Sequence, residues 1–96
     1  MGRIVSTWRL SVDPARLDEF LGLIRNDVPR TRAFEGCQRF EVFADSEGAV
    51  LFVEIWESQA HADRYGAWRR SNGDFELLGR YFTGAPQAAV YRETGI

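Results

Sequence analysis

The sequence predicts an α+β fold in which helices cover one face of a four-stranded antiparallel sheet, in the ferredoxin-like order βαββαβ. Three observations predict it: segments of alternating polarity, two strongly signalled helix starts, and a tight turn between two strand-like runs. The chain has 96 residues, which is the size of one domain. Because no internal repeat, linker or low-complexity segment divides it, we expect residues 1–96 to form a single domain.

Residues 3–12 alternate between apolar and polar side chains and form the first predicted strand. Asp13 and Pro14 follow, and an N-cap acceptor with proline at the first helical position is a strong helix start. Apolar residues then recur at helical spacing as far as Val28. Pro29 is expected to end or kink this helix. A further helical turn can follow it before Gly36 and the next strand.

The second half of the chain predicts the remaining elements from the same kinds of signal. The expected order is a strand over residues 37–44, a tight turn at 45–48, a strand over 49–56, a helix from Ser58 to about Arg70, a short helical piece over 74–82, and a last strand over 87–92.

The strand over residues 49–56 is largely apolar on both faces. Strand side chains alternate between faces, so one face carries a single acid between two aromatic rings (Phe52, Glu54, Trp56) and the other carries Leu51, Val53 and Ile55. Such a strand needs cover on both faces. Because a short chain supplies helices for one face only, we expect the other face to pack against a second copy, forming a homodimer.

Composition narrows the functional classes. The net charge of -2 argues against a nucleic-acid or anionic-membrane surface. All 12 basic residues are arginine, which excludes Schiff-base chemistry from a lysine. The single cysteine, Cys37, cannot form an intrachain disulfide, and one cysteine with one histidine cannot build a multi-ligand zinc or copper site. With no membrane-spanning run and no leader pattern, we expect a cytoplasmic protein.

The run Phe-x-Glu-x-Trp-Glu-Ser at residues 52–58, with Gly-Cys at 36–37 opening the preceding strand, resembles the antibiotic biosynthesis monooxygenase family. The first strand followed by an acid-proline helix start resembles it too, and the similarity extends from about residue 4 to residue 91. The resemblance implies a dimeric α+β barrel, in which the open faces of two sheets pack against each other.

The resemblance also implies a chemistry. Some members of the family are cofactor-independent oxygenases of polyketide anthrones or quinols, and others degrade haem. An electron-rich phenolate or enolate can pass an electron to dioxygen itself, so the protein needs only a dry aromatic pocket, groups that favour the deprotonated substrate and a route for the proton. The resulting hypothesis is a cofactor-free monooxygenase acting on an aromatic polyketide- or quinol-like small molecule.

Aromatic residues near the motif are the candidates for lining such a pocket. The substrate-binding candidates are Trp56, Phe52, Trp8, Phe40 and Trp68. For each of them the alternative is an ordinary core position. Trp68 forms an aromatic-basic cluster with Arg69 and Arg70 at the end of its helix. The simpler explanation is that positive charge there favours the helix dipole, and the alternative is binding of an acidic or phenolate ligand.

Three residues are candidates for proton transfer. His61 is the only side chain whose unperturbed titration lies near neutrality, and Tyr65 shares its helix face four residues on. Glu54 could act as a base if it is unpaired and desolvated. The alternatives are an exposed helix position for His61 and a structural ion pair with an arginine for Glu54.

Several positions depart from the specialised members of the family. Many members carry histidine where this chain has Tyr65, the anthrone oxygenases carry asparagine where it has Phe52, and they carry tyrosine where it has Ala62. These departures favour a second hypothesis, a non-catalytic small-molecule-binding or sensing dimer of the same fold. Haem degradation is the third hypothesis, but this chain lacks the axial histidine of the haem-degrading members.

Overall fold

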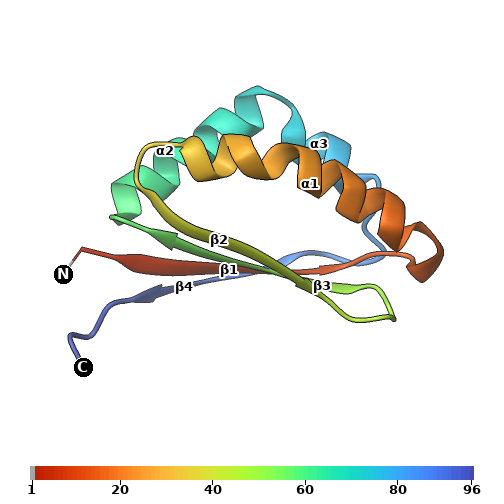
Figure 1. The fold of residues 1–96 in the computed structure, drawn as a ribbon, viewed down its shortest axis with the longest axis horizontal. Helices are drawn as coiled ribbons and strands as arrows, with labels where there is room; N and C mark the ends of the chain where they lie inside the picture. The colour runs from red at the N-terminus through yellow and green to blue at the C-terminus, as the bar shows by residue number, and fades with distance from the viewer. Residues whose placement is uncertain (1) are drawn as a thin grey trace.

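Four antiparallel strands form one sheet in the order β2-β3-β1-β4 in the computed structural model, which describes residues 2–96. The strands are β1 (Ile4–Ser11), β2 (Cys37–Ala44), β3 (Ala49–Trp56) and β4 (Gln87–Arg92). Figure 1 shows helices α1 (Leu17–Ala33), α2 (Gln59–Ser71) and α3 (Asp74–Gly79) arching over one face of the sheet. The predicted ferredoxin-like α+β fold is confirmed.

The connection from β1 to α1 begins at the predicted cap. The backbone N–H of Ala15 donates to Asp13 Oδ1 over 2.9 Å, and a 3-10 turn over Pro14–Arg16 leads into α1. The helix does not end at Pro29, which lies inside it. Pro29 is exposed, so the carbonyl that it leaves unpaired can bond to water, and buried residues on both sides hold α1 on the sheet.

The later helices differ slightly from their predicted bounds. Ser58 caps α2 as expected, because its Oγ accepts from the backbone N–H of His61 over 3.2 Å. The third helix ends at Gly79 rather than continuing to Phe82. Phe82 instead forms an isolated antiparallel bridge with Val12, which brings the chain back to the end of β1 in an extended conformation.

The face of the sheet below the helices carries the core. One buried cluster lies at the α3 side and is formed by Leu10, Val12, Phe20, Ile24, Phe40, Val50, Phe52 and Leu78. A second, smaller cluster lies at the α2 side, where Ile4, Trp56 and Tyr65 are buried with Phe34 and Trp68 against them. Both clusters contain residues of β3, because every second side chain of that strand points toward the helices.

The opposite face, which we call the open sheet face, has an apolar centre along β3. Val5 of β1 pairs with Ile55 of β3 on one side and with Tyr91 of β4 on the other. Phe43 and Tyr91 are 52% and 59% exposed there. No element among residues 2–96 covers this face (Figure 1). It is the face that the sequence assigns to a second copy.

None of the helices that these residues form combines the length and apolar character needed to cross a membrane.

Two glycines give a matched test of the backbone. Gly48 in the β2–β3 turn has a φ of 94°, and a Cβ there would overlap the carbonyl oxygen of Val12. Gly22 lies in α1 with nothing near its absent Cβ. We expect Gly22→Ala to raise the free energy of unfolding by roughly 0.5–1 kcal/mol, and Gly48→Ala to lower it by more than about 1 kcal/mol. Urea unfolding measures both, and shifts in the same direction would contradict this account.

Candidate active site

A cavity of about 530 Å³ lies between the helices and the sheet. Its apolar lining comes from both layers, with Trp8, Leu10, Phe40 and Phe52 from the strands and Ile24, Val28 and Leu78 from the helices. Three of the aromatic residues that the sequence predicts to bind substrate, Trp8, Phe40 and Phe52, therefore line it. The rings of Phe40 and Phe52 pack on each other with centroids 5.5 Å apart.

Six of the polar residues that line the same cavity are buried or half-buried, and they form what we call the polar wall. They are Ser6, Asp27, Thr31, Glu54, Tyr65 and Arg69. Strand register explains part of it, because Glu54 of β3 lies between Ser6 of β1 and Phe40 of β2. The remaining members come from α1 and α2, so the polar wall joins the sheet to two helices.

Glu54 is the buried acid of the polar wall. It is 5% exposed, and Trp56 Nε1 donates to its Oε1 over 2.9 Å. Burial raises the pKa of Glu54, while the Trp56 hydrogen bond and the charge of Arg69 act in the opposite direction. The sequence left open a structural ion pair for this acid, but none forms within the described residues. Glu54 is therefore a carboxyl group whose proton is held more tightly than usual.

Tyr65 provides a hydroxyl group to the polar wall. Its Oη lies 2.7 Å from Thr31 Oγ1, and either atom can be the donor. Burial raises the pKa of Tyr65 to about 12, so the phenol is neutral at physiological pH. Tyr65 can therefore donate a hydrogen bond to a bound molecule, whereas Glu54 is the group that can accept a proton.

Trp56 lies behind the cavity rather than on its lining. It is fully buried, and its ring packs on Tyr65 and Phe34 with centroid distances of 4.8 Å and 6.2 Å. The structure therefore gives Trp56 a supporting position: it orients Glu54 through its hydrogen bond and positions the Tyr65 ring.

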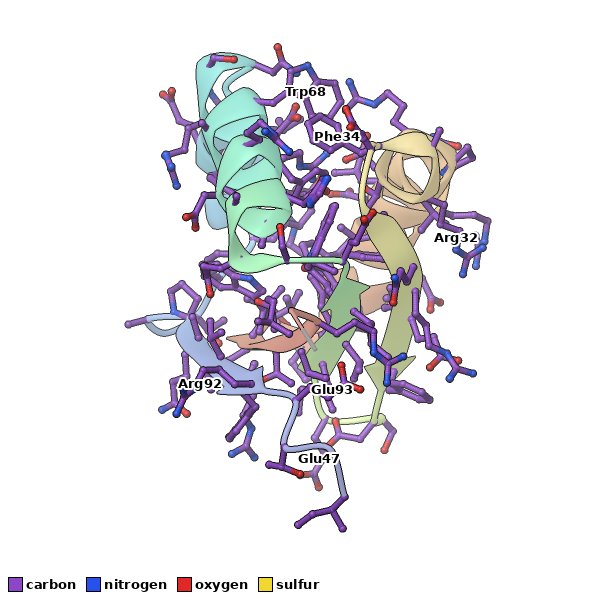
Figure 2. The ribbon with its side chains drawn as sticks, turned by 90° about the vertical axis from the view of Figure 1, so that its left-hand side faces the viewer. Arg32, Phe34, Glu47, Trp68, Arg92 and Glu93 are labelled. Carbon is purple, nitrogen blue, oxygen red and sulfur yellow. The ribbon has the colours of Figure 1, made fainter. Side chains whose placement is uncertain are left out.

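Trp68 also lies outside the lining. Figure 2 shows Trp68 and Phe34 between α1 and α2, above the sheet, where their ring centroids are 5.3 Å apart. The guanidinium of Arg30 lies over the Trp68 ring at 5.2 Å. The environment of Trp68 is thus the contact between two helices, beside the buried cluster that contains Tyr65.

His61 is placed away from the other candidate catalytic residues. Its Nδ1 lies 2.7 Å from Ser58 Oγ, and its ring packs against Gly36. Its Nε2 lies 3.9 Å from Glu35 and 4.0 Å from Glu57, both on the outside of the fold. His61 does not line the cavity. The structure brings Glu54 and Tyr65 together, but not His61.

Arg69 belongs to the polar wall, and the sequence placed it in an aromatic-basic cluster with Trp68 and Arg70. It is 4% exposed, and its Nη1 lies 3.3 Å from Asp27 and 3.2 Å from Asp74. From the sequence, the helix dipole is the simpler explanation of this arginine, and binding of an acidic or phenolate ligand is the alternative. The available signal was its spacing from Tyr65, since residues four apart share a helix face.

The site offers specific chemistry to a flat aromatic molecule. The strands provide an apolar surface, Glu54 provides a proton acceptor, and Tyr65 provides a hydrogen-bond donor. Within residues 2–96, no group of three His, Cys, Asp or Glu side chains is arranged to hold a metal ion.

Comparison with known proteins agrees with the fold described above. The family model described as antibiotic biosynthesis monooxygenase matches residues 3–73. The chain belongs to this family. No match to a curated protein was found.

Solved structures of similar proteins cover almost the whole chain. A conserved protein from Methanosarcina mazei has a TM-score of 0.88 at 21% identity, covering 98% of this chain and 95% of that one. A monooxygenase from the gene ActVA-Orf6 of Streptomyces coelicolor, in complex with nanaomycin D, has a TM-score of 0.80 at 26% identity, covering 97% and 88%. SnoaB, a cofactor-independent oxygenase from Streptomyces nogalater, has a TM-score of 0.80 at 12% identity, covering 98% and 95%. The family member described here shares its fold with these three proteins.

The raised pKa of Glu54 gives a testable stability signature. A carboxyl whose pKa is higher in the folded than in the unfolded state stabilises the fold in acid, and this contribution is lost as pH rises through the folded pKa. Glu54→Gln removes the ionisation but keeps an oxygen that can accept from Trp56. We therefore expect the difference in unfolding free energy, variant minus wild type, to increase from acid to neutral pH. The increase should be about 1.4 kcal/mol for each unit by which the fold raises the pKa of Glu54. Urea unfolding at several pH values tests this, and a pH-independent difference would contradict it.

Proposed function

We propose that this protein is a cofactor-independent monooxygenase acting on a phenolic aromatic small molecule of the polyketide or quinol type. The observation that carries the proposal is a buried acid of raised pKa, Glu54, on the wall of an aromatic-lined cavity. A cavity of about 530 Å³ falls in the usual range for small-molecule sites. The nanaomycin D complex and the activity named for SnoaB support the substrate class by analogy.

The proposed chemistry begins with a proton transfer. Glu54 in its ionised form accepts the proton of a substrate phenol or enol, and the resulting anion passes one electron to dioxygen. The organic radical and superoxide then join through a carbon–oxygen bond, and the proton returns from Glu54 to give a hydroperoxide. Loss of water completes the reaction, so that an anthrone CH2 and O2 become a carbonyl and H2O.

The protein contributes through position and polarity. The apolar lining excludes water from the anionic intermediate, and the neutral Tyr65 hydroxyl can donate to an oxygen on which negative charge develops. A general base of raised pKa suits this reaction, because its pKa lies closer to neutral pH and closer to the pKa of the phenol than that of an ordinary carboxyl group.

Oxygen uptake with a reduced anthrone or quinol tests the proposal. We expect the wild type to consume oxygen at a rate that increases as pH rises through the pKa of Glu54. Glu54→Gln should reduce kcat at least about 100-fold, because a general base contributes roughly 10²–10⁴. His61→Gln is the matched control and should change kcat little.

The opposite result for these two variants would overturn the assignment of the base. Saturable quenching of tryptophan fluorescence without oxygen uptake would favour the alternative function, a binding or sensing dimer.

We also propose that the protein is a homodimer joined through the open sheet face. The support is the apolar centre of that face, formed by Val5, Leu51, Val53 and Ile55 and flanked by the exposed rings of Phe43 and Tyr91. A contiguous apolar surface of this kind on a small domain is typical of an interface between proteins.

A single charge should disrupt this interface. Val53 lies in the centre of the open sheet face, opposite Thr7 and Glu41. Val53→Glu would bury an unpaired charge in the contact, so we expect it to shift the protein from dimer to monomer in light scattering at micromolar concentration. Asn26→Glu places the same charge on the exposed surface of α1 and should leave the dimer intact. A monomeric wild type would exclude this interface.

A further inference from the structure

We infer that Arg69 binds the substrate oxygen, and that the site selects molecules whose ionisable hydroxyl fits between the Arg69 guanidinium and the Glu54 carboxylate. This inference deepens the proposed function, because it names the group on the substrate that the cavity recognises. It adds a residue of α2 to a site that the sequence located mainly on the strands.

The first observation is an unused donor. Arg69 lines the cavity and is 4% exposed, yet its Nε is shielded and has no hydrogen-bond partner within the described residues. Both of its acidic partners contact Nη1 instead. Buried polar groups in folded proteins are almost always paired, so an unpaired one calls for an explanation. A molecule that enters the cavity and displaces the side chains shielding Nε would bring an oxygen within reach of this donor.

The second observation is how firmly Arg69 is held. Asp27 reaches its Nη1 from α1 and Asp74 reaches the same atom from α3. Arg30 contacts the same two acids at 3.0 Å and 3.4 Å, so two arginines and two aspartates form one network of balanced charge. The guanidinium is therefore fixed in place by three helices before any ligand binds, which reduces the cost of using it for recognition.

The third observation is the relation between Arg69 and Glu54. The charge of Arg69 favours the ionised form of Glu54, but the two side chains form no ion pair. A strong acceptor and a strong donor thus face one cavity without satisfying each other. A phenol hydroxyl is both donor and acceptor, so it can donate to Glu54 while it accepts from Arg69. After proton transfer the phenolate keeps the cationic neighbour and Glu54 is neutral.

The charged and titratable groups around Arg69 come from every element that packs on it. They are Asp27 and Arg30 of α1, Tyr65 of α2, Asp74 of α3 and Glu54 of β3. Because the two acids are shared with Arg30, removing Arg30 disturbs the same network without removing a residue that lines the cavity. Arg30 is therefore a matched control for Arg69.

The experiment is a spectroscopic titration of bound alizarin, a hydroxyanthraquinone whose absorption changes on ionisation and which needs no turnover. We expect alizarin to ionise at lower pH when bound to the wild type than when free. Arg69→Gln should raise the pKa of the bound dye by about one unit, a tenfold change in its ionisation constant, because hydrogen bonds to charged groups are among the stronger ones. Arg30→Gln should leave it close to the wild-type value.

Three results would overturn the inference. They are an unchanged or raised pKa of alizarin on binding to the wild type, no saturable binding of alizarin at all, or equal shifts in Arg69→Gln and Arg30→Gln. The first two need no variant, so the test holds even if Arg69→Gln fails to fold. A second measurement compares alizarin with its dimethyl ether, which can accept but not donate. We expect at least tenfold weaker binding of the ether to the wild type, and similar affinities would overturn the inference.

Failure here is distinguishable from failure of the proposed function. A lowered dye pKa without oxygen uptake would reject the monooxygenase and retain the phenol site at Arg69. Oxygen uptake that is lost in Glu54→Gln but unaffected by Arg69→Gln, with no shift of the dye pKa, would retain the monooxygenase and reject the role of Arg69.

Discussion

A carboxyl group held in an apolar interior by one indole hydrogen bond is the constraint on which the rest of the site depends. Among residues 2–96 no charged partner contacts Glu54, so Trp56 Nε1 at 2.9 Å is its anchoring donor. That indole is in turn fixed by its ring contact with Tyr65, whose hydroxyl bonds to Thr31 of α1. These contacts together fix the positions of the Glu54 carboxyl group, the Tyr65 phenol and the two helices above them. The cavity between the helices and the sheet depends on these positions.

The electrostatics of the site follow from separating opposite charges. The positive charge of Arg69 acts to lower the pKa of Glu54, yet Arg69 forms its ion pairs with Asp27 and Asp74. Burial of the acid is thus only partly offset, and the carboxyl retains its affinity for a proton. Direct contact between Arg69 and Glu54 would have given a structural salt bridge with little capacity for proton transfer. The helix network prevents that contact by holding the guanidinium elsewhere.

The fold could be predicted from the sequence because its signals are local. The alternation of β3, the Asp13-Pro14 cap and the turn ending at Gly48 each depend on neighbouring residues alone. The length of α1 could not, since the effect of Pro29 depends on its exposure and on packing at both ends of the helix. For the site, alternation placed Phe52 and Glu54 on one face, but it could not show that the Trp56 ring lies behind the cavity. The sequence could not show that Arg69 is buried on the cavity wall, because Asp27, its partner in α1, is 42 residues away.

The contact between Gly36 and His61 has an evolutionary consequence. Gly36 has a φ of 89°, and a Cβ at this position would overlap the imidazole ring. A side chain at 36 and an imidazole at 61 are therefore mutually exclusive. Relatives with a bulkier residue at the first position must carry a small one at the second, so the two sites should drift as a coupled pair. The histidine at position 61 of α2 is thus compatible only with a glycine in the turn at position 36.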